Sequence, residues 1–409
     1  MLLRILRPLV ALIVTVVIIT QLFSQITTRY AAPCEGESMF SQNNGLRMEM
    51  LSSSSSPYRA LNNRSKFELA LNSITPPTIY HCSNFAEGFG LIRDLLPEHK
   101  VDDKVLTNGN WHKGLKDKES SEYDIFIESY GARMSCNCNQ DGLTWLFTKF
   151  KGQFIYMSGE STKYPFDKQY AYNPHRHHVF GPIFPNDEVG PSDMILTLLQ
   201  IIWWDTFKPF LTPAVMTDGE FRPKGNGTYF LVYAQGNCVG FRDNAFGLLS
   251  KLGQVHQAGK CGYNNPVNIT KVGDQWDVHV WNWQNNFHGK HYQNYRFCLV
   301  MEHSNEGFYV TEKIMMAFAS GCIPIYYGPE DFIYSIFNKK AFVYYDINNP
   351  SSALNLVSRL EANRTMYDEM LNEPILANGN NTIEEYFSFD ESIGNGLLKR
   401  RVKDKLNFP

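Results

Sequence analysis

The clearest pattern of apolar and polar positions lies in the last third of the chain. Two uninterrupted apolar runs, Phe297–Met301 and Cys322–Tyr327, flank a segment with apolar residues at helical spacing. Short runs without polar alternation are typical of strands buried on both faces. Thr311 is expected to cap the N-terminus of the intervening helix, and Gly321 to end it. The pattern predicts a strand, a helix and a second strand parallel to the first.

A loop, residues 302–311, joins the first of these strands to the helix, and its first part, 302–308, is polar. In an open parallel sheet, ligands bind outside the carboxyl ends of the strands, where this loop is expected to lie. The start of a helix attracts anions, and Lys313 adds a positive charge there. This arrangement favours a phosphate-bearing ligand. The alternative is that Glu312 and Lys313 are ordinary charges of a first helical turn.

Similar patterns on both sides of this segment predict two α/β units. The strands of the second unit are expected to include residues 229–233, 254–256 and 341–345, and its helices residues 242–249 and 352–371. In the first unit, order is expected to begin near Thr78, with strands at 123–129 and 152–157, a helix at 142–150 between them, and a joining helix at 195–210. The basic tail after Lys399 is interpreted as a solvated end.

The N-terminus carries an apolar run without charge, residues 9–23, preceded by Arg4 and Arg7. Extended to Ile26, the run approaches the length that spans a bilayer. The basic flank predicts a cytoplasmic N-terminus and a lumenal remainder. A cleaved signal peptide is the alternative, and it also leads into the secretory pathway. Residues 27–77 show little periodicity and are interpreted as a flexible stem.

Composition narrows the class of protein. Of the 409 residues, 43% are hydrophobic, and the net charge is −3, with a pI near 6.4. The chain can bury large cores, and it lacks the excess of basic residues that is typical of nucleic-acid-binding proteins. Five Asn-x-Ser/Thr sequons agree with a secretory location: Asn63, Asn226, Asn268, Asn363 and Asn380.

The chain has eight cysteines, for which the oxidising lumen predicts disulfides without fixing the pairing. Cys298 and Cys322 fall in the two expected buried strands, so we expect them to be free thiols of the core. A zinc site is not expected, because no two Cys-x-x-Cys pairs occur. His175, His177 and His178 are interpreted as loop residues rather than metal ligands.

The central segment resembles the donor-binding motif of the α1,3/4-fucosyltransferases, glycosyltransferase family 10. The resemblance rests on Glu302, on Tyr309-Val310-Thr311-Glu312-Lys313, and on Ile323-Pro324-Ile325 with Gly328. One departure is His303, where the family usually has Asn. The resemblance to this family is looser over residues 152–166 and 229–264.

The resemblance implies a fold and a set of site residues. The fold would be of GT-B type, with two Rossmann-like domains facing a cleft. Glu160 corresponds to the family's general base, and Arg242 to its phosphate-contacting arginine. Donor-binding residues would be Arg242, Glu302, Tyr309, Glu312 and Lys313.

The implied function is inverting transfer of L-fucose from GDP-fucose to a glycan hydroxyl in the Golgi, with N-acetylglucosamine of an N-glycan or lactosamine as the expected acceptor. No Asp-x-Asp pair occurs, so no metal site or obligatory cofactor is expected, and a divalent cation would be at most stimulatory. The alternatives are a transferase using another nucleotide sugar and a catalytically inactive Golgi glycan-binding protein.

The expected division of the chain is a cytoplasmic tail (1–8), a membrane anchor (9–26), a stem (27–77), an acceptor-binding domain (78–205), a GDP-fucose-binding domain (206–375) and a C-terminal segment (376–409).

Overall fold

The computed structural model describes the two expected α/β units in part. The described residues are 77–82, 86–101, 120–129, 150–157, 159, 161, 178–182, 184, 189–259, 261–262, 268–272 and 292–406. Several expectations fall outside them: the anchor, the stem, nearly all of the helix at 142–150, Glu160, Asn63, His175 and His177. Within the described ranges, no helix is both long enough and apolar enough to cross a bilayer.

The first unit is built on a parallel sheet of six strands in the order β2-β1-β3-β4-β5-β6. Its elements are β1 (Thr78–Cys82), α3 (Ala86–Leu95), β2 (Lys100–Val101), β3 (Ile125–Ser129), β4 (Gln153–Met157), β5 (His178–Gly181) and β6 (Met194–Ile195). The strands expected at 123–129 and 152–157 are confirmed as β3 and β4. His178 was expected in a loop but lies in β5, where its ring nitrogens are within hydrogen-bond distance of Gln153 Oε1 and the Ser192 carbonyl.

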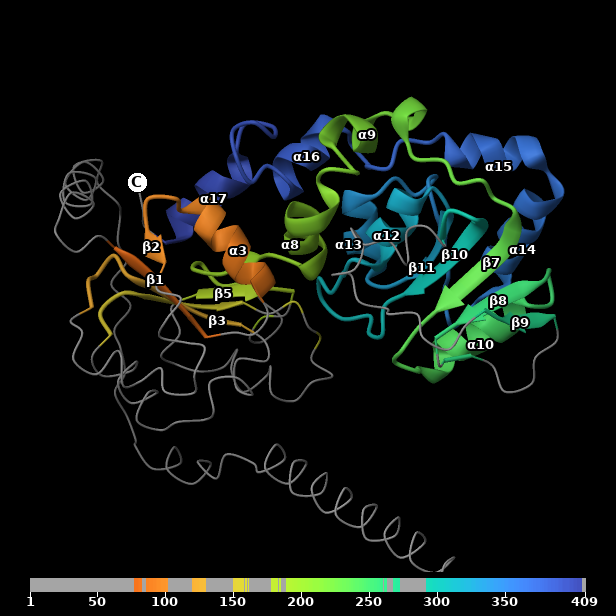
Figure 1. Ribbon diagram of the computed structural model, residues 1–409, viewed down its shortest axis with the longest axis horizontal. Helices are drawn as coiled ribbons and strands as arrows, with labels where there is room; N and C mark the ends of the chain where they lie inside the picture. The colour runs from red at the N-terminus through yellow and green to blue at the C-terminus, as the bar shows by residue number, and fades with distance from the viewer. Residues whose placement is uncertain are drawn as a thin grey trace, which may run out of the picture.

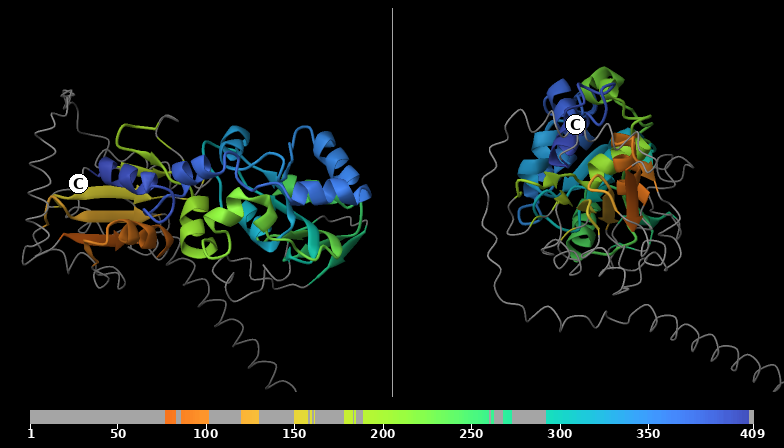
Figure 2. Two further views of the ribbon diagram at one scale, coloured as in Figure 1. Left: turned by 90° about the horizontal axis from the view of Figure 1, so that it is seen from above. Right: turned by 90° about the vertical axis from the view of Figure 1, so that its left-hand side faces the viewer.

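Two short helices, α8 (Leu198–Ile202) and the π-helix η2 (Trp203–Phe207), lead out of the first unit, and α9 (Pro213–Thr217) and the 3₁₀ turn η3 (Gly219–Phe221) follow. Figure 2 shows the two sheets side by side, with α8 between them. Trp203 is fully buried in this connection and its ring packs on Phe387. The aromatic run expected to join the units therefore forms part of the core that connects them.

The second unit has another parallel six-stranded sheet, in the order β12-β11-β10-β7-β8-β9. Its elements are β7 (Tyr229–Ala234), α10 (Gly240–Leu249), β8 (Val255–Ala258), β9 (Ile269–Lys271), β10 (Tyr295–Met301), α12 (Lys313–Ser320), β11 (Ile323–Tyr327), α13 (Glu330–Ile336), β12 (Val343–Tyr344), α14 (Ser351–Ala362) and α15 (Arg364–Leu371). The helical segment expected at 352–371 is confirmed, and it is divided into the two helices α14 and α15. The chain breaks at Asn363, whose side chain caps α15 by accepting from the Met366 amide.

The central strand β10 is buried on both faces, as its apolar run predicted. Phe297, Leu299 and Met301 pack in the cluster formed with α10, α14 and α15. Cys298 and Val300 face the opposite cluster, which includes α12. Gly321 ends α12 with φ 75°, and an added Cβ there would meet the Gly225 amide nitrogen at 2.2 Å. Only glycine fits this stop without strain.

The C-terminal helices α16 (Asn380–Tyr386) and α17 (Leu397–Lys405) return toward the first unit, as Figure 1 shows. Leu398, Val402 and Leu406 are buried in the core cluster that also contains Ile79 of β1. The Lys403 ammonium lies 3.1 Å from the Glu98 carboxylate. The expectation of a solvated basic end is therefore wrong, because the apolar face of α17 packs against the first unit.

Two disulfides join described cysteines, Cys238–Cys261 and Cys298–Cys322. The expectation that Cys298 and Cys322 are free thiols is wrong. Strand β10 pairs with β11 so that Cys298 lies opposite Pro324, and Cys322 precedes β11 on the same side of the sheet. Parallel pairing thus brings together two sulfurs that are 24 residues apart in sequence.

Candidate functional site

The candidate site is formed where β7 and β10 end. The chain leaves β7 at Gln235 and enters α10, which carries Arg242 near its start, and it leaves β10 at Glu302 and enters α12 through the loop 302–311. The carboxyl ends of adjacent parallel strands meet at one edge, so these segments lie together. The structure therefore brings together five of the predicted donor-binding residues: Arg242, Glu302, Tyr309, Glu312 and Lys313.

Glu302 organises the loop from within. Its side chain has no exposed surface. Its carboxylate accepts from the Thr311 amide at 2.7 Å and from the Thr311 hydroxyl at 2.9 Å, and the Tyr326 hydroxyl donates to it at 3.4 Å. Burial and the neighbouring Glu302 carboxylate hold the pKa of Tyr326 well above its ordinary value, so Tyr326 remains a donor.

Thr311 does not cap the helix as expected, because its hydroxyl donates a hydrogen bond to the Glu302 carboxylate. Helix α12 begins at Lys313, and the Glu312 side chain at the N-cap position accepts no capping hydrogen bond. The two ends of the loop are instead tied by the carboxylate of the residue that follows β10. The bonds from Thr311 to Glu302 fix both ends of the loop. A cap formed by Thr311 alone would fix only the end next to α12.

Lys313 is already surrounded by oxygens. Its ammonium lies 3.2 Å from Glu302 Oε2 and 3.6 Å from Glu312 Oε1, and it donates to the Thr311 hydroxyl at 2.7 Å. Burial alone would lower the pKa of Lys313, but the carboxylates of Glu302 and Glu312 outweigh it and raise the pKa. Lys313 is therefore charged, and its donors are directed toward groups of its own chain.

Arg242 differs from Lys313 because one of its donor nitrogens bonds no residue that the structure describes. Its guanidinium is buried, with Nε donating to the Glu302 carbonyl at 3.4 Å and Nη1 donating to Gln235 Oε1 at 3.2 Å. Nη2 is buried and has no hydrogen-bond partner in the part of the chain that the structure describes. An orphaned guanidinium donor at the carboxyl edge of a parallel sheet fits an anionic ligand.

Tyr309 is buried, and its hydroxyl lies 3.1 Å from His303 Nδ1. The other ring nitrogen of His303 lies 2.8 Å from the Ser161 hydroxyl, which belongs to the first unit. Sequence reasoning noted His303 only as a departure from the family motif and did not single out Ser161. The 142 residues between these two side chains leave no local signal of the contact.

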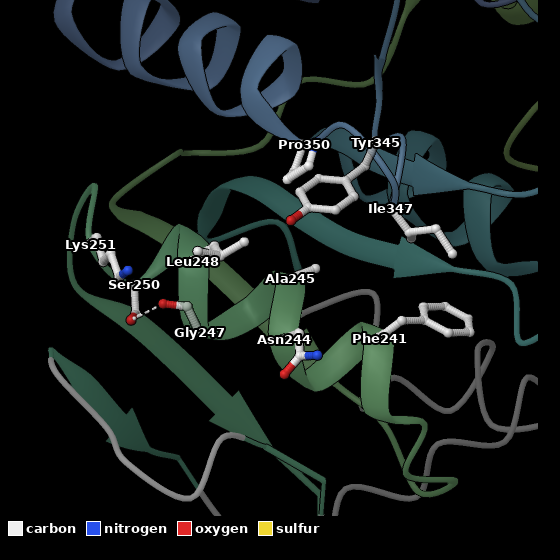
Figure 3. Close-up of a pocket in the computed structure, with 10 residues that line it drawn as sticks. All are labelled: Phe241, Asn244, Ala245, Gly247, Leu248, Ser250, Lys251, Tyr345, Ile347 and Pro350. Carbon is white, nitrogen blue, oxygen red and sulfur yellow. Dashed lines mark hydrogen bonds between the residues drawn. The ribbon is translucent and has the colours of Figure 1, made fainter.

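A groove of about 480 Å³ lies elsewhere, along the outer face of α10 (Figure 3). Its lining residues are Phe241, Asn244, Ala245, Gly247, Leu248, Ser250, Lys251, Tyr345, Ile347 and Pro350. None of the predicted site residues lines it. We therefore place the candidate site at the edge of the sheet, where the charged groups converge, and not in this groove.

Four of the five predicted sequon asparagines are described, and all four are exposed: Asn226, Asn268, Asn363 and Asn380. Asn363 also caps α15, and Asn226 accepts from the amide and hydroxyl of Thr228 in its own sequon. No group of three or more His, Cys, Asp and Glu side chains suited to a metal ion occurs among the residues described.

Comparison with known proteins points to the same family that the sequence motif resembles. The model of the family described as glycosyltransferase family 10 (fucosyltransferase) C-term matches residues 228–372. Residues 228–372 therefore match the C-terminal domain of glycosyltransferase family 10. The family 10 domain runs from β7 to α15 and contains Arg242, Glu302, Tyr309, Glu312 and Lys313.

Two curated relatives align over parts of the chain. A putative fucosyltransferase of Acanthamoeba polyphaga mimivirus is 30% identical over 139 residues, which are 32% of this chain and 22% of the relative. The α-(1,3)-fucosyltransferase FucT of Helicobacter pylori is 38% identical over 80 residues, 19% of this chain and 16% of the relative. The alignments thus span about a fifth of each relative's length.

Crystal structures of an α1,3-fucosyltransferase are also similar to this chain. The structure with GDP-fucose superposes with a TM-score of 0.45 and 16% identity, covering 86% of this chain and 96% of the other. The structure with GDP has a TM-score of 0.44 and 15% identity over the same shares. The assignment to family 10 rests on the family model and the aligned relatives.

Proposed function

We propose that the protein is a GDP-fucose-dependent fucosyltransferase of GT-B architecture. The observation that carries the proposal is the buried Arg242 guanidinium, whose Nη2 has no hydrogen-bond partner among the described residues, set within a family 10 domain at the carboxyl edge of the sheet. A diphosphate would supply the missing acceptor. The relatives named above as fucosyltransferases support fucose as the transferred sugar.

Arg242 is better placed than Lys313 to bind the diphosphate directly. Its Nη2 has no partner within the described ranges, whereas the Lys313 ammonium is engaged by Glu302, Glu312 and Thr311. Lys313 would contribute mainly by neutralising Glu302, so that the loop presents little net negative charge to an anionic donor. Two fixed cations near the leaving diphosphate would replace the divalent cation that other sugar-nucleotide transferases use.

The reaction would be a single displacement with inversion. An acceptor oxygen forms a bond to the anomeric carbon of fucose as the bond from that carbon to the diphosphate oxygen breaks, and GDP leaves with the electron pair. Glu160, assigned from the resemblance, would take the acceptor proton as general base. Tyr309 and Glu312 would contact the donor.

The linkage, the acceptor, the cellular location and the roles of the two units are part of the same proposal. The α1,3 linkage and a glycan acceptor carrying N-acetylglucosamine follow from the resemblance to the α1,3/4-fucosyltransferases. The apolar N-terminal segment and the exposed sequons support a single-pass type II protein with its catalytic domains in the Golgi lumen. The first α/β unit would bind the acceptor and the second GDP-fucose.

The test offers the purified full chain GDP-fucose beside GDP-mannose and UDP-sugars, with N-glycan and lactosamine acceptors and with EDTA present. Mass spectrometry and linkage analysis of the product would identify the sugar, the acceptor and the bond. We expect fucosyl transfer that survives EDTA and falls about a hundredfold or more in Glu160→Gln. Transfer from a different nucleotide sugar would contradict the donor assignment, and binding of GDP-fucose without turnover would favour a glycan-binding protein.

A further inference from the structure

His303 joins the two halves of the protein by hydrogen bonds at both ring nitrogens. Nε2 lies 2.8 Å from the hydroxyl of Ser161, which follows β4 in the first unit. Nδ1 lies 3.1 Å from the hydroxyl of Tyr309, in the loop of the second unit that Glu302 organises. All three side chains are buried, so water competes little for these bonds.

We propose that His303 is a positioning residue that fixes Ser161 of the first unit against the loop 302–311, which is the donor loop of the proposed function. This inference rests on the proposed function and concerns the alignment of its two substrates. Ser161 directly follows the predicted base Glu160 in sequence, and Tyr309 is a predicted donor contact. His303 would thereby set the separation between the acceptor side and the donor side of the site.

The chemistry of imidazole makes this link specific. A neutral ring carries one N–H donor and one acceptor nitrogen, so whichever nitrogen accepts must receive its proton from a hydroxyl. Either tautomer can therefore satisfy Ser161 and Tyr309 at once. Because the three side chains are buried, breaking either bond to His303 costs more than it would at the surface, and this favours one arrangement of the bonds.

Other contacts dock the same loop to the first unit without His303. The Phe308 amide donates to the Pro182 carbonyl at 3.1 Å, and the Phe308 ring packs edge-on against Phe184. The Val310 carbonyl accepts from the Leu199 amide at 3.1 Å. These contacts should keep the units together when His303 is replaced, so the effect should fall on alignment of the substrates and hence on kcat.

Two amide substitutions separate the two ends of the link. The amide of His303→Gln reaches about as far as Nε2 and can keep the bond to Ser161. The shorter amide of His303→Asn sits near Nδ1 and can keep only the bond to Tyr309. The bond to Ser161 is the one that crosses between the units, so His303→Gln should retain more activity than His303→Asn.

Steady-state kinetics of the full chain with GDP-fucose and its acceptor test the proposal. For His303→Asn we expect kcat to fall about tenfold or more, with KM for GDP-fucose changed less than about threefold, and partial recovery in His303→Gln. Ser161→Ala should be slowed similarly, and the double variant Ser161→Ala/His303→Asn should be no slower than His303→Asn alone.

The matched control is Ser335→Ala, because the Ser335 hydroxyl lies 3.0 Å from the Tyr386 hydroxyl and joins α13 to α16 away from the site. It should lower the melting temperature about as much as Ser161→Ala and leave kcat unchanged. Unchanged kcat in folded His303→Asn, or additive losses in the double variant, would overturn the positioning role while the proposed function stands. A wild type that transfers no fucose would overturn the proposed function and this inference with it.

Discussion

The Lys313 ammonium lies 3.2 Å from the Glu302 carboxylate, whose side chain is fully buried. A buried ion pair contributes to stability through its hydrogen bonds as well as through its charges. Removing one partner leaves the other charge buried without compensation. Here the carboxylate also holds Thr311 and Tyr326. The donor loop therefore depends on Glu302 for its conformation.

The first prediction concerns that dependence. Glu302→Gln should lower the free energy of unfolding by about 3–5 kcal/mol, because it leaves Lys313 without its buried partner and places an amide donor among other donors. Denaturant unfolding of the full chain measures the loss. Glu312→Gln is the control, because Glu312 lies 3.6 Å from the same ammonium on a partly exposed side chain. Equal losses for the two variants would contradict a special role for Glu302.

A second prediction separates charge from geometry at Arg242. Arg242→Lys keeps the positive charge but loses the planar fork that bonds Gln235 and the Glu302 carbonyl. We expect GDP-fucose affinity measured by calorimetry to fall about tenfold to a hundredfold, the loss of one or two charge-assisted hydrogen bonds.

The control for Arg242 is Arg296→Lys. Arg296 also bonds a backbone carbonyl, that of Gly227, and pairs with Glu361, but it lies near the start of β10, at the opposite edge of the sheet. Its replacement should leave the affinity for GDP-fucose unchanged. A loss of affinity equal to that of Arg242→Lys would show that the effect is a general loss of stability.

Much of the second unit could be predicted from the sequence because local rules decide it. The apolar runs that became β10 and β11 are too short for helices and have no polar alternation. Gly321 could be identified as the helix stop because it follows the last apolar residues of the helical pattern, where glycine commonly ends a helix. Arg242 could be placed at the carboxyl edge of the sheet because it follows a strand in a parallel sheet.

The partners of these residues were not predictable, because they depend on contacts between distant segments. Thr311 has the residue type of an N-cap, but a buried carboxylate nine residues earlier takes its hydroxyl. The bond between His303 and Ser161 crosses 142 residues. Cys298 and Cys322 have the burial of free core thiols, and only the register of β10 on β11 brings them together.

The two disulfides give a third prediction, because they close loops of nearly equal length at different places. Their sequence separations are 23 for Cys238–Cys261 and 24 for Cys298–Cys322. Replacing either pair by Ala should cost about 3 kcal/mol of unfolding free energy, on the chain-entropy estimate. Cys238 lies between β7 and α10, next to the Asn237 carbonyl that accepts from Arg242.

The two variants should therefore differ in ligand binding. Loss of Cys238–Cys261 should weaken GDP-fucose binding, because it frees the loop that supports Arg242. Loss of Cys298–Cys322 should leave the affinity of the folded protein unchanged. Chemical unfolding and calorimetry on both double variants measure these effects, and equal affinities in the two would contradict the role given to the Cys238 loop.

The last prediction concerns pH and the connection between the two units. Partial removal of the carboxyl group from water, followed by the nearby Asp94 carboxylate, raises the pKa of Asp205 to about 7, against the opposing effects of Arg93 and Lys208. Asp205 lies in the π-helix η2, beside Trp204, whose indole donates to Asp94 at 3.2 Å. The folded state thus binds this proton more tightly than the unfolded chain does.

The direction in which stability changes with pH follows from proton linkage. The stabilisation by the Asp205 proton is full below the ordinary aspartate pKa of about 4 and is lost as pH rises toward about 7. Asp205→Asn, which is neutral throughout, should therefore gain stability relative to wild type as pH rises across this range. Because the Asp205 residue is exposed, we expect a gain below about 1 kcal/mol. Melting temperatures at several pH values measure it, with the exposed Asp404→Asn as control. A stability difference between Asp205→Asn and wild type that is constant from pH 4 to 8 would rule out the raised pKa.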